Sequence, residues 1–121
     1  MSPKSKRELA REHLETARED LEGGREKDVI NALFYAAEAA AVALAEAHGV
    51  ETKQRHGLKA DAVTELHKKR VLATDYGPTL RELNQARKDV WYEGEDPDLD
   101  EPLADVLDEI EQLVEEAEKT Q

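Results

Sequence analysis

The chain has 121 residues, the length of one domain, and it contains no cysteine, which excludes disulfide bonds and thiolate metal sites. Its 29 acidic residues outnumber the 17 lysines and arginines, so the formal net charge is −12. This charge disfavours a broad nucleic-acid surface, although a local basic pocket is compatible with it. The longest apolar run, Ala39–Ala45, is too short to span a membrane, and no secretory signal follows Met1. We therefore expect a cytoplasmic protein that does not contact a membrane.

Apolar residues recur at helical spacing along the chain and no alternating β-branched pattern appears, so we expect five helices and no strands. The first helix is predicted over Lys6–Glu22, behind a flexible N-terminus of residues 1–5. Ser5 and Glu8 have the spacing of a capping box, and Gly23-Gly24 is a typical helix stop.

The second helix is predicted over Glu26–His48, with Gly49 as its stop. It is long and rich in alanine, which favours a central position with neighbours on several sides. Three polar residues interrupt its middle: Asn31, Tyr35 and Glu38. Their spacing of i, i+4 and i+7 places them on one stripe of the helix.

Two shorter segments follow the polar loop Glu51–His56. The third helix is predicted over about Leu58–Lys69, followed by a loop or weak turn over Arg70–Gly77. The fourth helix is predicted from Pro78, which suits a first helical turn, to about Tyr92.

An acidic linker over residues 95–101 precedes the last helix. Asp100 is a good N-cap, Pro102 suits the first turn, and regular apolar spacing runs from Leu103 to Ala117. Helices joined by short loops indicate an antiparallel up-and-down bundle, all-α, in a single domain over residues 1–121.

Arg87 is the exception in this pattern. Leu80, Leu83, Val90 and Trp91 fall on one side of the fourth helix, and Arg87 falls in the middle of that side. An unpaired buried charge is very costly, so we expect the guanidinium to have a partner.

The sequence contains no recognisable metal or phosphate motif. The four histidines lack the spacing of di-iron bundles or of a helical zinc pair, and no glycine-rich phosphate loop or nucleophile motif is present. We therefore expect neither a metal nor another cofactor.

Glu38 has two interpretations. It lies solvated at the edge of the bundle, or it faces Arg87 across the bundle or across a dimer interface, where the two charges would satisfy each other. Asp89 is most simply a surface residue, and it is also a candidate for a supporting polar group. The large aromatics Trp91 and Tyr35 are candidates for a dimer interface.

Three segments together resemble the HEPN domain family of small prokaryotic helical proteins, over about Leu9 to Ala117. The first is HLETAREDLEGG, a helix before a glycine stop. The second, DVINALFYAAEAAAVALAEAHGV, looks like the family's central helix, and the third, LRELNQARKDVWYEG, looks like its late helix with an arginine followed by Tyr or His. The segment RHGLKADAVTEL also resembles the family's third helix.

This resemblance implies an antiparallel bundle that forms homodimers and works in toxin–antitoxin, defence or nucleotide-related systems, often with a minimal nucleotidyltransferase partner. Some members are metal-independent ribonucleases that use an Arg followed four to six residues later by a His, supported by a polar residue of the second helix. Arg87 matches that arginine, and Glu38 or Asn31 matches the supporting residue. The histidine window holds Tyr92, Glu93 and Gly94 instead.

The missing histidine separates the functional hypotheses. Histidine titrates near neutral pH, as a general acid and base must, whereas tyrosine titrates near 10. We therefore favour a homodimeric interaction or nucleotide-associated module, for which RNA or a nucleotide is a possible partner that the net charge disfavours. The alternative is an endoribonuclease in which Arg87 stabilises the phosphorane and Tyr92 transfers a proton. A third reading is a bundle that matches the family only through its alanine-rich pattern.

Overall fold

The computed structural model describes residues 4–50, 52, 56–94, 99 and 101–120, of which 56–58 by their backbone only. Within these residues the protein is all-α, with no strand. The five helices are α1 Lys6–Glu22, α2 Glu26–Ala47, α3 His56–Lys68, α4 Gly77–Trp91 and α5 Leu103–Lys119. The predicted fold class is thus confirmed, and the observed helix ends differ from the predicted ones by two residues or fewer.

Two helix starts test the capping predictions. The capping box is confirmed, since Ser5 Oγ accepts from Glu8 N at 3.1 Å and Glu8 Oε1 accepts from Ser5 N at 3.4 Å. At α5 the N-cap is Pro102, which has no side-chain capping hydrogen bond. Asp100, the predicted N-cap, lies outside the described residues, as do residues 95–98 of the predicted linker.

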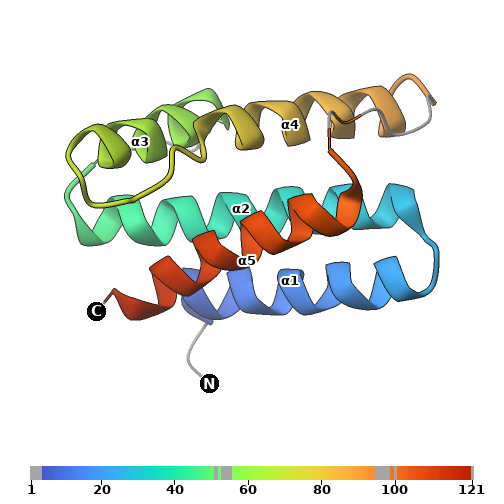
Figure 1. Ribbon diagram of the computed structural model, residues 1–121, viewed down its shortest axis with the longest axis horizontal. Helices are drawn as coiled ribbons and strands as arrows, with labels where there is room; N and C mark the ends of the chain where they lie inside the picture. The colour runs from blue at the N-terminus through green and yellow to red at the C-terminus, as the bar shows by residue number, and fades with distance from the viewer. Residues whose placement is uncertain (1–3, 51, 53–55, 95–98, 100, 121) are drawn as a thin grey trace.

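The central position predicted for α2 is confirmed. Figure 1 shows α1 along one side of α2, α3 and α4 along the other, and α5 lying across α1 and α2. By length and composition α2 is apolar enough to cross a membrane. Its positions Ala36, Ala37, Ala40 and Ala41 are nevertheless fully buried in the bundle, because all four other helices pack against it. Alanine side chains allow this close approach.

A close contact between α3 and the start of α4 fixes the position of α4. Asp75 accepts hydrogen bonds from Thr64 Oγ1 at 2.7 Å and from Gly77 N at 2.9 Å. Partial burial raises the pKa of the Asp75 carboxyl, but these two hydrogen bonds and the nearby positive charges outweigh it, so that the pKa is lowered overall. A Cβ atom at Gly77 would lie 2.1 Å from Thr64 Oγ1, so the helices meet here only because residue 77 has no side chain.

The excess of negative over positive charge comes from the last part of the chain. Residues 1–92 contain 16 basic and 16 acidic residues, whereas residues 93–121 contain 13 acidic residues and one lysine. The net charge of −12 therefore arises entirely from the segment that includes α5. Some of its carboxylates tie α5 to the bundle: Glu118 pairs with Arg11 at 2.5 Å and Glu111 pairs with Arg18. Others, such as Asp108 and Glu115, face solvent.

Candidate functional site

One stripe of α2 is left partly open by its neighbours. Between Val29 and Ala45 the positions that are not buried are Asn31, Tyr35, Glu38, Ala39, Val42 and Ala43. These positions follow the i, i+4, i+7 and i+11 spacing of one helix face. The three polar residues that the sequence placed on one stripe do lie on it. We call this stripe, together with Arg87, Trp91 and Tyr92 at the end of α4, the open face.

Arg87 of α4 lies at the edge of the open face, and its guanidinium packs on aromatic rings. Its Cζ is 4.7 Å from the centroid of the Phe34 ring of α2 and 5.9 Å from that of Tyr92. Its Nη2 donates to Asn84 Oδ1 at 3.2 Å, one turn earlier on α4. The charge is therefore held by ring faces and an amide oxygen, and cation–π contacts of this kind contribute about 0.5–2 kcal/mol.

One nitrogen of Arg87 has no hydrogen-bond acceptor. Among the described residues, Arg87 Nε is the single buried side-chain nitrogen or oxygen without a partner. A buried donor left unsatisfied costs roughly 1–3 kcal/mol. This donor is therefore left unsatisfied by the described residues.

The C-terminal end of α4 is more exposed than the sequence pattern indicated. Leu80, Leu83 and Val90 are buried as their spacing predicts, but Trp91 is 50 % exposed and Tyr92 is 70 % exposed. The expectation that Trp91 continues the core-facing side is wrong, since this last residue of α4 is half exposed. Two large, partly exposed aromatic side chains therefore end α4, and the ring of one of them, Tyr92, contacts Arg87.

The remaining candidates are spread over the open face and beyond it. Glu38 Oε2 pairs with Lys59 Nζ of α3 at 3.1 Å, and the Tyr35 ring contacts the His13 ring of α1 at 5.7 Å between centroids. The pairing of Glu38 with Arg87 across a dimer interface stays a prediction. Asp89 accepts from Gln85 Nε2 at 2.9 Å, on the side of α4 away from Arg87.

Sequence reasoning missed three partners of these residues. Asn84 precedes Arg87 by three positions, a spacing at which helical side chains meet, so that contact was open to prediction. Phe34 under the guanidinium and Lys59 beside Glu38 come from other helices. No local signal in the sequence indicates them, because their contacts depend on how the helices pack.

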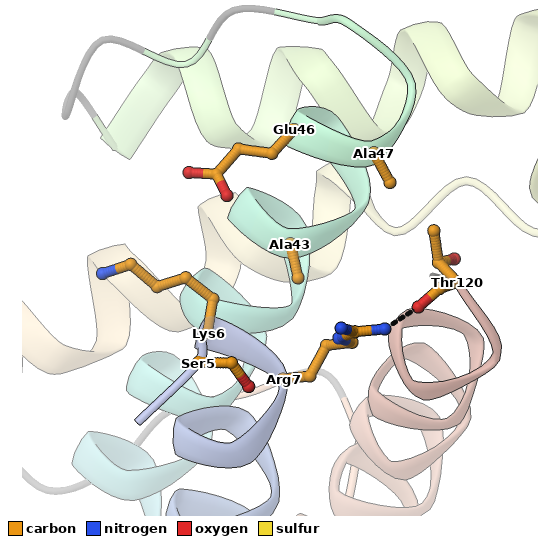
Figure 2. Close-up of a pocket in the computed structure, with 7 residues that line it drawn as sticks. All are labelled: Ser5, Lys6, Arg7, Ala43, Glu46, Ala47 and Thr120. Atoms are coloured by element: carbon orange, nitrogen blue, oxygen red, sulfur yellow. Dashed lines mark hydrogen bonds between the residues drawn. The ribbon is translucent and has the colours of Figure 1, made fainter. Parts of the chain in front are cut away.

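A hollow at the opposite end of the bundle contains none of the predicted site residues. It has a volume of about 270 Å³ and lies where the start of α1 meets the ends of α2 and α5. Figure 2 shows Arg7 pointing across it to the carbonyl oxygen of Thr120, to which it donates a hydrogen bond, while Lys6 extends away on the side of Glu46. Arg7 is therefore occupied in tying α5 to α1.

The geometry around Arg87 suits the binding of an acceptor next to aromatic surface. No group of three or more potential metal ligands occurs among the described residues. The sequence model of the HEPN domain matches residues 5–120, nearly the whole chain. The chain belongs to the HEPN domain family. No match was found among curated proteins or among solved structures.

Membership of the HEPN domain family rules out one reading of the sequence. A chance likeness through alanine-rich patterning does not account for a match that extends over all five helices. Arg87 of this HEPN domain lies on α4, and Tyr92 is the C-cap residue of that helix. The HEPN match establishes the family, and it does not by itself assign a role to Arg87.

Proposed function

We propose that this HEPN domain is a non-catalytic interaction module that forms a homodimer through the open face and acts with a nucleotidyltransferase partner in a toxin–antitoxin or defence-type system. The observation that carries the dimer is the exposure of Trp91 and Tyr92 at the end of α4, where the Tyr92 ring contacts the Arg87 guanidinium. The nucleotidyltransferase partner rests on the family resemblance.

Aromatic side chains and arginine are the residue types that dominate protein interfaces. They offer a large apolar surface together with a few directed hydrogen bonds. Trp91 and Tyr92 supply that surface, and Arg87 supplies a donor that is already partly desolvated and held on Phe34. Because the guanidinium is fixed before binding, little side-chain entropy is lost when an acceptor arrives.

The charge distribution favours the same face. Two copies that met through α5 would bring two segments of net charge −12 together, and like charges at an interface oppose association. The helices of the open face belong to residues 1–92, whose charges balance. Self-association through the open face therefore avoids this repulsion.

The oligomeric state tests the proposal. Sedimentation equilibrium should give about twice the 13.6 kDa chain mass at micromolar concentration. Trp91→Ala should weaken the dimer roughly tenfold or more, the usual effect of removing an aromatic anchor. Val71→Ala is a matched control, because Val71 is also exposed but lies outside the open face. A monomeric wild type, or equal effects of the two variants, would refute the proposed interface.

The contact between Arg87 and Tyr92 supports the alternative, an endoribonuclease. A guanidinium 5.9 Å from an exposed phenol ring resembles an electrostatic stabiliser beside a proton donor. Cleavage of RNA in the presence of a chelator should then be seen with wild type and lost in Arg87→Ala. Absence of cleavage, or equal cleavage by both proteins, eliminates this alternative.

A further inference from the structure

A second feature of the open face lies away from Arg87, in a groove between α1, α2 and α3. The groove has a volume of about 170 Å³. Its apolar lining comes from Leu9, Ala39 and Val42, and the contacting rings of His13 and Tyr35 also line it. A dry cavity of about 150 Å³ is large enough for benzene, so this groove suits an apolar group about one ring in size.

Lys59 lines the groove and is unusually buried for a lysine. It is 8 % exposed, and it is the one charged residue in the buried class among the described side chains. Glu38 is the single acceptor that the described residues give it, at 3.1 Å. An ammonium group has three N–H donors, so Lys59 can donate to a further acceptor in the groove without leaving Glu38.

The charge of the groove is opposite in sign to that of the chain. Lys6 and Lys59 against Glu38 leave a net charge of +1. Another hollow, of about 380 Å³, lies beside the start of α5, and its charged lining residues are Glu26 and Glu101. Of these two hollows, the groove is the one whose electrostatics favour an anion.

We propose that this groove binds a small organic carboxylate whose apolar part is about one ring in size. The ring packs against Tyr35, His13 and the apolar lining, and the carboxylate accepts hydrogen bonds from Lys59 and the more exposed Lys6. The carboxylate suits this end because a charge-assisted hydrogen bond to an ammonium is about twice as strong as a neutral one. The groove shares Tyr35, Glu38, Ala39 and Val42 with the open face but does not include Arg87, Trp91 or Tyr92, so measuring benzoate binding on the Trp91→Ala variant as well separates binding in the groove from formation of the dimer.

Benzoate is a suitable probe, with benzyl alcohol as the uncharged ligand of the same ring size. We expect benzoate to bind the full chain with a dissociation constant in roughly the millimolar range, as the small number of ligand atoms dictates. It should shift the amide resonances of Tyr35 to Val42 in two-dimensional NMR spectra. Benzyl alcohol should bind at least about tenfold more weakly, the effect of losing one charged hydrogen bond. Equal binding of both ligands, no saturable shift, or shifts confined to other helices would overturn the proposal.

Two variants distinguish a loss of ligand binding in the groove from a loss of folding stability. Lys59→Met removes the ammonium group and with it the ion pair to Glu38. This variant can therefore lose folding stability as well as benzoate binding. Val42→Phe fills the groove and keeps the ion pair, and Val71→Phe adds the same side chain outside the groove. We expect Val42→Phe to lose benzoate binding while Val71→Phe keeps it. Wild-type binding by a Val42→Phe protein that melts like wild type would refute the groove as the site.

Discussion

Replacing Gly77 with alanine should destabilise the protein through the contact between α3 and α4. The added Cβ would meet Thr64 Oγ1 at 2.1 Å and the carbonyl oxygen of Ala60 at 3.0 Å. If Thr64 rotates away, its hydrogen bond to Asp75 is lost, at a cost of about 1 kcal/mol, and the shift of the Ala60 backbone adds to this. Overpacking at such contacts typically costs about 1–3 kcal/mol, against a gain of at most about 1 kcal/mol from the helix propensity of alanine.

The expected net loss is about 2 kcal/mol of unfolding free energy. For a chain of this size that corresponds to a fall in Tm of very roughly 6–12 °C. Urea denaturation followed by circular dichroism measures the free energy directly, and an unchanged m-value would show that the unfolded state is unaffected.

A double-mutant cycle tests the stated cause. Thr64→Ala removes the atom nearest to the new Cβ, so Gly77→Ala should cost about 1 kcal/mol less in that background. Gly24→Ala is the control: its cost comes from a φ of +73° with no atom within 4 Å, so Thr64→Ala should leave it unchanged. Additive losses for Gly77→Ala and Thr64→Ala would refute the steric explanation.

Three further predictions follow from contacts at the helix ends. Because folding lowers the pKa of Asp75, the carboxylate stabilises the protein at pH values above its unfolded pKa, and this stabilisation is lost as the pH falls through its folded pKa. The stability advantage of wild type over Asp75→Asn should therefore shrink below about pH 4. A stability advantage that does not change with pH would contradict this prediction. Ser5→Ala should cost about 1 kcal/mol through the capping box, while Thr16→Ala, at an exposed position inside α1, should cost nothing. The hydrogen bond from Arg11 lowers the pKa of Glu118. Glu118→Gln should therefore reduce the unfolding free energy by at most about 1 kcal/mol at neutral pH, and by less at high salt. A loss of stability that does not depend on salt would count against an ionic contact.

The sequence predicted the helices well because their signals are local. Ser5 and Glu8 lie within one turn of each other, and Gly49 at φ +71° follows the end of α2 as a glycine stop should. The central position of α2 was also predictable, since a helix that is apolar on nearly every side has to be covered on nearly every side.

The details of the site were less predictable because they depend on packing between helices. The pattern placed Arg87 on the core side of α4, but it does not indicate that the Phe34 ring lies under the guanidinium. It likewise gave no reason for Lys59 to approach Glu38. Trp91 has the spacing of a core residue and is nevertheless half exposed, because periodicity specifies a direction around the helix and cannot specify where the neighbouring helix ends.

Because the excess of negative charge comes from the last part of the chain, α5 contributes to both packing and net charge. Its buried residues Ile110, Leu113, Val114 and Ala117 cover α1 and α2, and its outer carboxylates belong to the segment that provides all of the molecule's net repulsion. A chain that ended before residue 93 would be electrically neutral and would also expose the apolar surface that α5 covers. Such a truncated chain would lack both the net charge that opposes aggregation and the cover of its apolar core, so it should precipitate near neutral pH.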